Sequence, residues 1–512
     1  MNLAALVRSH GAEERALYGD GRWHTWGDVR HRAAALAAGL RALGVGVDDR
    51  VALAWPTSVD FVVAYLGVLA AGAVAVPLNP NSPTGELRRE LEVVEPVVLV
   101  AGGAAVSAAA DVPGVRVVAP ARSASGAAAA PGAGGVPAWE ELSGVGAPGP
   151  GAFEPVERDD AELAVLLFTS GTAGDPRAAM LTHGNLLANI HQMLAVPEIL
   201  RGDDVVLVAL PLFHVFGLNV AIGLCVATGA ALVLDSRFDA EASLRQVHEL
   251  GVTTLLGVPA MFAAWADVSG PAANGGSPLA GVRRAISGAS ALDPAVAARF
   301  EDRHGIALWQ GYGLTEASPA VSTSFGTGRN RPGSVGPPLP GVEVRLVDEE
   351  GDPVLEGDPG EIWVRGANVF AGYWRDPEAT ARVLTSDGWL RTGDIGVVGE
   401  DGDLFVVDRS KDLVIVSGFN VFPGEVERVV CSLPGVAECV VVGRPDEATG
   451  ERVEAVVVPA EGAEVSAEEV RSHCAARLAR YKCPTSVRFV PSLPHGLTGK
   501  ALRRALREET PA

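Results

Sequence analysis

Short runs of apolar residues alternate with helical patterns over much of the first three hundred residues, and this pattern constrains the fold most. VVLVAL at 205–210, ALVL at 231–234 and TTLLGV at 253–258 do not alternate between apolar and polar positions. Strands of this kind are buried on both faces, as in parallel sheets covered by helices. The sequence therefore predicts an α/β fold built on parallel sheets.

The apolar run from Phe61 to Leu78 has two interpretations, a membrane span or buried secondary structure. It is rich in Ala and Gly, contains Pro77, and lies at the short end of the length that a span needs. These features favour a buried helix over 61–71 followed by a buried strand over 73–76. We therefore expect no membrane span.

The character of the sequence changes further along its 512 residues. Residues 101–151 are rich in Ala, Gly and Pro, which predicts a surface excursion without chemistry. After Arg331, short strands separated by Gly, Asp and Pro turns predict an antiparallel, barrel-like region. The last hundred residues suffice for a small α+β domain. We predict two domains, 1–410 and 411–512, with the boundary within 408–411.

Charge and cysteine content exclude some classes of protein. The chain has 41 Lys and Arg against 62 Asp and Glu, a formal net charge of −21. Such a chain repels phosphate backbones, so no nucleic-acid partner is expected, although backbone N–H groups can still form a local anion pocket. The five cysteines include no CxxC pair, and the N-terminal segment has no apolar signal core. These features predict no disulfide framework, no zinc site and a cytoplasmic location.

The first candidate motif lies in LAVLLFTSGTAGDPRAAMLTH, residues 163–183. An apolar strand runs into a loop of hydroxyl residues and glycines at 169–174, and a helix is predicted over 185–194. Such a loop can fold tightly around an anion, with N–H and O–H donors converging on phosphate. The same composition is also typical of a plain turn, so both interpretations stay open for this motif alone.

The second candidate motif is QGYGLTE at 310–316. A tyrosine between glycines offers a flat face for a purine. The adjacent threonine and glutamate offer a hydroxyl and a carboxylate for hydrated Mg²⁺. A turn at the end of a strand with a half-buried tyrosine explains the motif equally well.

Three further motifs follow toward the C-terminus. DGWLRTGD at 387–394 ends in a carboxylate that could accept both ribose hydroxyls. DRSKD at 408–412 precedes GFNVFPGEVE at 418–427, and LTGK lies at 497–500. Taken singly, these motifs are more typical of turns and solvated surface charges than of a binding site.

The five motifs occur in one order, and that order resembles the adenylate-forming superfamily. This superfamily includes acyl-CoA synthetases, aryl and 4-coumarate–CoA ligases, adenylation domains of peptide synthetases, and firefly luciferase. The resemblance runs from Thr25 to Lys500, nearly the whole chain. Further short matches are PLFHVFG at 211–217, GVP at 257–259, SGAS at 287–290, GSVG at 333–336 and GY at 372–373.

The resemblance implies a fold and a reaction. The fold is a large N-terminal domain of two α/β layered subdomains and a distorted β-barrel, with a small mobile α+β lid at the C-terminus. The reaction is ATP-dependent adenylation of a small-molecule carboxylic acid with release of pyrophosphate, then transfer of the acyl group to coenzyme A. ATP, Mg²⁺ and coenzyme A are therefore the expected cofactors.

The resemblance also implies site residues. The expected nucleotide contacts are Thr169, Ser170, Gly171, Thr172, Gly174 and Arg177 at the phosphates; Ser287, Gly288, Ala289, Gln310, Gly311, Tyr312 and Gly313 around adenine; Thr315 toward the phosphates; and Asp394 and Arg409 at the ribose.

The remaining implied roles are catalytic or concern the lid. Lys500 matches the lid lysine that bridges the carboxylate and the α-phosphate, and His214 matches a residue near the acyl carboxylate. Cations and N–H donors fixed around the developing charge lower the barrier to attack on the α-phosphorus. The expected catalytic residues are Lys500, His214, Thr172 and Glu316, with Glu316 as the metal ligand; the hinge and coenzyme A residues are Lys411, Gly418 and Phe419.

The chain departs from the family pattern in the phosphate loop. Where the family usually has Thr-Gly-Lys-Pro-Lys-Gly, this chain has AGDPRA at 173–178. Asp175 therefore replaces a lysine, while Arg177 keeps one cation. An acid that points at pyrophosphate would repel it. The departure puts the rate of adenylation in question, and it motivates an alternative in which the protein loads a carrier protein or performs one half-reaction.

The acid substrate is constrained only by class. The segment 214–220 lacks the Asp with which peptide-synthetase domains hold an amino group, and a buried unpaired ammonium is costly. An α-amino acid is therefore disfavoured. Small residues at the expected pocket edge predict room for a fatty, aryl or polycyclic acyl group: Gly217, Gly288, Ala289, Gly311 and Gly313.

Overall fold

The computed structural model divides the chain into two compact units. The large unit comprises 1–343 and 364–390, and the small unit comprises 344–363 and 391–512. The structure describes residues 1–102, 104–109, 112–120, 137–144, 153–169, 176–268, 277–348, 350–355, 357–399, 401–409, 412–416, 419–446, 449–495 and 503–508.

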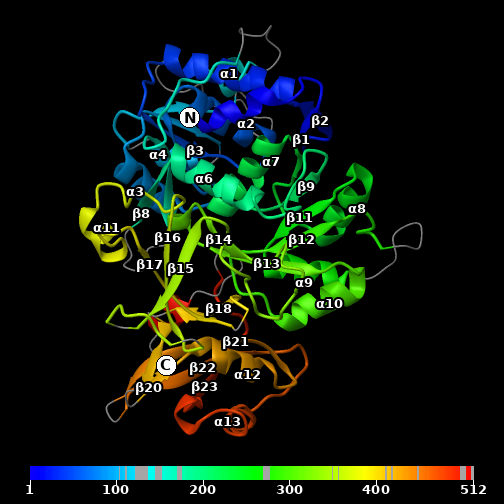
Figure 1. Cartoon of the computed structure of the whole chain (residues 1–512), viewed down its shortest axis with the longest axis vertical. Helices are drawn as coiled ribbons and strands as arrows, with labels where there is room; N and C mark the ends of the chain where they lie inside the picture. The colour runs from blue at the N-terminus through cyan, green and yellow to red at the C-terminus, as the bar shows by residue number, and fades with distance from the viewer. Residues whose placement is uncertain are drawn as a thin grey trace. The chain divides into compact units, whose positions relative to one another are not determined.

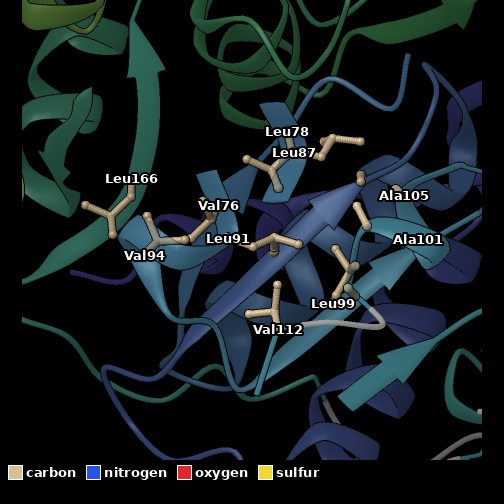
Figure 2. Close-up of a cluster of buried hydrophobic side chains, with 14 of the residues drawn as sticks. Val76, Leu78, Leu87, Leu91, Val94, Leu99, Ala101, Ala105, Val112 and Leu166 are labelled. Carbon is tan, nitrogen blue, oxygen red and sulfur yellow. The ribbon is translucent and has the colours of Figure 1, made fainter. Parts of the chain in front are cut away.

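A six-stranded sheet in the large unit has the order β6-β5-β3-β4-β7-β8, and only its last pair is antiparallel. Every residue of β4 and β5 is buried. Figure 2 shows the apolar core on this sheet, with Leu99 and Leu166 from strands and Leu87 and Leu91 from a covering helix. The strands are β3 (Arg50–Ala54), β4 (Val74–Pro77), β5 (Val98–Ala101), β6 (Arg116–Val118), β7 (Leu163–Thr169) and β8 (Arg177–Thr182).

The helices of this region include the segment that raised the question of a membrane span. Helix α2 (Val59–Ala70) is buried at all but one position and leads into β4, so the predicted buried helix and strand are confirmed. Among the described residues no helix is both long and apolar enough to cross a bilayer. The other helices here are η1 (Leu3–Ser9), α1 (Trp26–Ala42), α3 (Thr84–Val94), α4 (Ala104–Ala109) and α5 (Trp139–Leu142).

An eight-stranded sheet, also in the large unit, has the order β14-β13-β12-β11-β9-β10-β1-β2. Its six central strands are parallel, and antiparallel β14 and β2 close the two edges. In Figure 1 β11, β12 and β13 run side by side, as this order requires. The strands are β1 (Arg15–Gly19), β2 (Arg22–Thr25), β9 (Val205–Val208), β10 (Ala231–Leu234), β11 (Thr254–Gly257), β12 (Arg284–Ser287), β13 (Leu308–Gly313) and β14 (Ala320–Thr323).

The predicted parallel α/β character is confirmed, and the connections between the strands are mostly helical. Helix α6 begins at a capping box in which Thr182 and Asn185 bond each other's backbone N–H groups, consistent with the helix predicted over 185–194. The helical connections are α6 (His183–Leu194), η2 (Phe216–Gly223), α7 (Leu224–Thr228), α8 (Ala240–Leu250), α9 (Pro259–Asp267), α10 (Pro294–His304) and η3 (Thr315–Ala317).

A four-stranded sheet corrects one expectation. The strands predicted to form a distorted barrel, β15 (Val342–Val347), β16 (Gly360–Gly366), β17 (Leu390–Val398) and β18 (Leu404–Arg409), lie in the simple order β15-β16-β17-β18. Within the described chain the first and last strands do not pair, so the sheet is open. Helix α11 (Pro377–Val383) lies between β16 and β17 in the sequence.

The C-terminal part of the small unit is the predicted α+β fold. Strands β20-β19-β22-β21 form a sheet, and β23 pairs with β22. The predicted boundary within 408–411 concerns the point of rotation and stays a prediction. The elements are β19 (Val414–Val416), β20 (Phe419–Val421), α12 (Pro423–Cys431), β21 (Val436–Asp446), β22 (Gly450–Pro459), α13 (Ala467–Ala475), η5 (Arg480–Lys482), β23 (Ser486–Phe489) and α14 (Arg503–Glu508).

Candidate active site

The carboxyl ends of β9, β11, β12 and β13 meet at one edge of the eight-stranded sheet. The register pairs Gly257 with Ser287 and Ser287 with Gln310, so these strands end close together. Loops beyond the carboxyl ends of parallel strands are where open α/β sheets bind ligands. The fold thereby gathers at one edge the motifs at 211–217, 287–290 and 310–316, which lie far apart in the sequence.

The turn after β12 carries three of the expected adenine contacts. Gly288 N donates to Gly257 O at 3.1 Å, and Ala289 has φ +68°, in the left-handed region. Ser287 is buried, and its hydroxyl has no hydrogen-bond partner within the described chain. A buried orphan hydroxyl is costly, which makes the end of β12 a reasonable place for a ligand to bind.

The small residues expected to leave room for the acyl group are packed more closely than predicted. A Cβ on Gly288 would lie 3.1 Å from Cε1 of Phe216, and one on Gly217 would lie 2.5 Å from the carbonyl oxygen of Pro211. On Gly313 it would lie 2.2 Å from Pro319 O. At these three positions the glycines allow close approach of protein atoms, and the expected room for the acyl group stays a prediction.

Strand β13 holds the expected adenine-stacking tyrosine. Tyr312 is half-buried and lies opposite Ser322 on β14. Its neighbour Gln310 is buried; its backbone N–H donates to Ser324 Oγ at 2.9 Å and its side-chain amide donates to Ser334 O at 3.3 Å. Gln310 therefore anchors this segment of β13, and its predicted contact with adenine remains untested.

Glu316, the expected metal ligand, is held by the segment around Tyr373. Tyr373 Oη donates to Glu316 Oε1 at 2.7 Å, and Phe370 N donates to Glu316 O at 2.9 Å. Burial, together with the charge of Glu316, raises the pKa of Tyr373, so its phenol stays protonated as a donor. A fixed carboxylate suits Mg²⁺, which commonly takes one or two protein carboxylates with phosphate and water oxygens.

Arg177, the cation kept in the phosphate loop, lies at the start of β8. Backbone hydrogen bonds join β8 to the segment 371–374, including Met180 N to Gly372 O at 2.9 Å. Arg177 Nε lies 3.3 Å from Asp376 Oδ2, and its guanidinium carbon lies 5.9 Å from the ring centroid of Tyr373. Asp376 therefore compensates part of the charge assigned to pyrophosphate binding.

His214 lies in the loop after β9, and its hydrogen bond defines its tautomer. Phe216 N donates to His214 Nδ1 at 3.3 Å, so Nδ1 carries the lone pair and Nε2 carries the proton of the neutral ring. Burial lowers the pKa of His214, which keeps the ring neutral at pH 7. Within the described chain Nε2 has no partner, so its N–H is available to a carboxylate oxygen.

In the small unit the two expected ribose contacts are paired by the β ladder. Asp394 on β17 lies opposite Arg409 on β18. Asp394 is buried, and its backbone N–H donates to Thr392 Oγ1 at 3.0 Å.

Several predicted residues lie outside the described chain. The structure therefore does not place Ser170, Gly171, Thr172, Gly174, Lys411, Gly418 or Lys500, nor the side chains of Arg409 and Phe419. Thr169, the last described residue of β7, is half-buried, and Thr315 begins η3 beside Glu316.

Tyr373 and Asp376 are the site residues that sequence reasoning missed. In the sequence the pair at 372–373 contributes to the family resemblance, which implies no role for it. Its proximity to Glu316 depends on pairing between β8 and a segment almost two hundred residues away, which no local pattern reveals.

Comparison with known proteins matches both parts of the chain. The AMP-binding enzyme family model matches residues 4–374, and the AMP-binding enzyme C-terminal domain model matches residues 425–500. A feruloyl-CoA synthase from Amycolatopsis is 38% identical over 484 residues, covering 94% of this chain and 93% of its own. A long-chain-fatty-acid–CoA ligase from Yersinia pestis is 36% identical, covering 97% and 92%. The crystal structure of ATP-bound MatB from Rhodopseudomonas palustris superposes with a TM-score of 0.90 at 32% identity, covering 99% and 98%.

Proposed function

The chain belongs to the AMP-binding enzyme family, and from this premise we propose that it is an acyl-CoA synthetase. It adenylates a carboxylic acid with ATP, releases pyrophosphate, and transfers the acyl group to coenzyme A. The observation that carries this proposal is the gathering of His214, Tyr312 and the Tyr373–Glu316 pair on loops at and beside one sheet edge.

In the first step a carboxylate oxygen attacks the α-phosphorus of ATP, and the bond to pyrophosphate breaks. Two anions must approach each other, so the residues around them act mainly by neutralising and orienting charge. His214 suits the acid because a neutral ring that donates from Nε2 can hold a carboxylate oxygen without removing its charge. Lys500 supplies the positive charge in this proposal.

Mg²⁺ would be held by Glu316 and by phosphate oxygens, where it would neutralise charge on the leaving pyrophosphate. Tyr373 keeps the Glu316 carboxylate in one orientation through its 2.7 Å hydrogen bond. Tyr312 would stack on adenine, and Asp394 with Arg409 would bind the ribose hydroxyls.

In the second step a thiol attacks the carbonyl carbon of the acyl-adenylate, and AMP leaves. This anhydride is already activated, so positioning of the thiol can be sufficient. Coenzyme A is the proposed acceptor because the relatives from Amycolatopsis and Yersinia pestis are named as a CoA synthase and a CoA ligase. The second candidate acceptor is a carrier protein. Because Asp175 replaces a lysine in the phosphate loop, an enzyme that performs only one half-reaction remains an alternative.

The proposed substrate is an apolar acid, and fatty and aryl acids are both retained. The relatives compared above are named for feruloyl and for long-chain fatty acyl groups. The ring of Phe216 beside Gly288 supplies one apolar wall near His214. A cytoplasmic location stays a prediction from the cysteine content.

A panel of aryl, fatty and dicarboxylic acids, scored for AMP release and thioester, tests this proposal. We expect AMP and acyl-CoA in equal amounts with an aryl or fatty acid. AMP release only with a phosphopantetheine-bearing carrier protein would select the second candidate. ADP as the nucleotide product would contradict the proposal.

A further inference from the structure

Arg503 is the centre of a partly buried charge cluster in the small unit. It is the first residue of α14. Its Nη2 lies 2.6 Å from Glu427 Oε2 and its Nε lies 3.2 Å from Glu427 Oε1, a two-point contact. Its Nη1 lies 3.4 Å from Asp412 Oδ2 and 3.5 Å from Asp408 Oδ1. One guanidinium therefore contacts three carboxylates, which a lysine ammonium could not reproduce.

The partners of Arg503 are themselves held by backbone groups. Glu427 Oε1 accepts from Val441 N at 2.7 Å, and Asp408 Oδ2 accepts from Gly424 N at 2.7 Å. These contacts join the end of β18, the start of α12 and strand β21. Burial disfavours the guanidinium charge, but Glu427, Asp408 and Asp412 outweigh burial and raise the pKa of Arg503.

The other end of α14 is held by another arginine, Arg444, which is buried. Arg444 Nη1 donates to Arg507 O at 2.8 Å, and Arg444 Nη2 donates to Leu506 O at 2.9 Å. Glu454 accepts from the same guanidinium at 2.9 Å. The side chain of Leu506 is buried in a cluster with Val440 and other apolar residues. A six-residue helix is thus fixed at its start, its middle and its end.

Only two residues separate Lys500 from the start of α14 in the sequence, so Lys500 lies three residues before Arg503. Three extended residues span at most about 11 Å, so a fixed Arg503 limits where the Lys500 backbone can be. Asp408 and Asp412 also lie on either side of the predicted hinge residue Lys411 in the sequence.

We propose that Arg503 is a positioning residue for adenylation: by binding Asp408, Asp412 and Glu427 it ties the helix that follows Lys500 to the segment in which the small unit's hinge is predicted. This inference rests on the proposed function, because it assigns Lys500 to the first half-reaction. Asp412 and Glu427 follow the hinge in the sequence, so with these two contacts intact the rotating part would carry Lys500 without slack, and a misplacement of about 1 Å can cost about 10²-fold in rate.

The test compares Arg503→Lys and Arg503→Gln, each alone and combined with Lys500→Ala. Pyrophosphate exchange measures adenylation, and thioester yield from supplied acyl-adenylate measures the second step. We expect Arg503→Lys to lower adenylation about 10²-fold with thioester formation within about twofold of the unmodified enzyme. In the Lys500→Ala background it should cost nothing further, because the residue it positions is gone. Arg503→Lys keeps one cation among the carboxylates, so it remains informative if Arg503→Gln fails to fold.

Arg471→Ala is the matched control, since Arg471 is half-buried on α13 and, among the described residues, its side chain pairs with its neighbour Glu468 at 2.8 Å. It should leave both half-reactions unchanged. Equal losses in the two half-reactions for Arg503→Lys, or a full further loss in the Lys500→Ala background, would reduce Arg503 to structural support and overturn the inference. Normal adenylation in Lys500→Ala alone would overturn the role of Lys500 in the proposed function, and the inference with it.

Discussion

The two compact units hold their candidate functional residues by different means. In the large unit the site edge is built from strand ends, close glycines and neutral donors such as Tyr373 and the imidazole of His214. In the small unit, arginines paired with carboxylates fix the elements near the C-terminus, around Arg503 and Arg444. A nucleotide site benefits from rigidity before binding, whereas residues 411–512, the part of the small unit that is predicted to rotate, need strong internal contacts.

Among the tests of this difference between the two units, the largest effect is expected for Lys500→Ala. Loss of one charged contact to the transition state should lower adenylation by about 10²–10³-fold and spare thioester formation from supplied acyl-adenylate. The control is Lys482→Ala, which removes another lysine of the small unit, paired with Glu425 at 2.7 Å. Adenylation that survives in Lys500→Ala would break the proposed division of labour.

The acid response of the large unit follows from a buried neutral histidine. Burial lowers the pKa of His183 to about 4, and its Nδ1 accepts from Leu3 N at 3.1 Å. A lowered folded-state pKa means that the stabilisation is complete above the unfolded value of about 6.5 and is lost as the pH falls toward 4. The free energy of unfolding should fall by about 3 kcal/mol over this range. Urea unfolding at several pH values measures this fall. His183→Gln should flatten this dependence; an unchanged slope would contradict the assignment.

Close backbone approach at the site edge predicts a steric penalty for Gly313→Ala. A Cβ there would lie 2.2 Å from Pro319 O, so the backbone must shift at a cost of about 1–3 kcal/mol. Gly85→Ala is the control, because a Cβ at Gly85 meets nothing within 4 Å and its helix α3 should gain slightly. If Gly313→Ala and Gly85→Ala changed the melting temperature equally, there would be no steric penalty particular to Gly313.

These close approaches mark the limit of what the sequence can predict. The motif at 310–316 predicted the location of Tyr312 and Glu316, because glycines and paired polar residues at a strand end are visible in one short stretch. It did not predict that Tyr373 donates to Glu316, since that contact depends on long-range pairing. Nor did the sequence predict that Phe216 packs against Gly288, because glycine allows either empty space or close packing and only the neighbouring side chain decides which.

The small unit gives the same lesson from charges. DRSKD at 408–412 is typical of a solvated turn, yet Asp408 is buried against Gly424 N and Arg503. Sequence spacing cannot reveal that an arginine about ninety residues later supplies the compensating charge. The fold class, by contrast, was predictable, because apolar strands report their own burial locally.

A smaller effect is expected for Tyr373→Phe. It removes a hydrogen bond to an ionised carboxylate, which should lower kcat about tenfold and raise the Mg²⁺ concentration needed for half-maximal rate. Tyr65→Phe is the control, because Tyr65 is buried and its hydroxyl has no partner within the described chain. An unchanged Mg²⁺ dependence in Tyr373→Phe would contradict the role of Glu316 as a metal ligand.

The smallest effect is expected for Asp175→Lys in the phosphate loop. A restored cation near the leaving pyrophosphate should leave adenylation unchanged or modestly faster, measured by pyrophosphate exchange. Complete loss of adenylation would give Asp175 a positive role that electrostatics alone does not explain.

The central claim is that a carboxylate oxygen of the acid attacks the α-phosphorus of ATP. Isotope transfer tests this claim most directly. An acid labelled with ¹⁸O in both carboxylate oxygens is incubated with ATP, Mg²⁺ and coenzyme A, and the products are analysed by mass spectrometry. Attack by the carboxylate leaves one labelled oxygen on phosphorus after the thiol cleaves the acyl bond. The account predicts one ¹⁸O in AMP and none in pyrophosphate; label in inorganic phosphate, or unlabelled AMP beside the thioester, would contradict it.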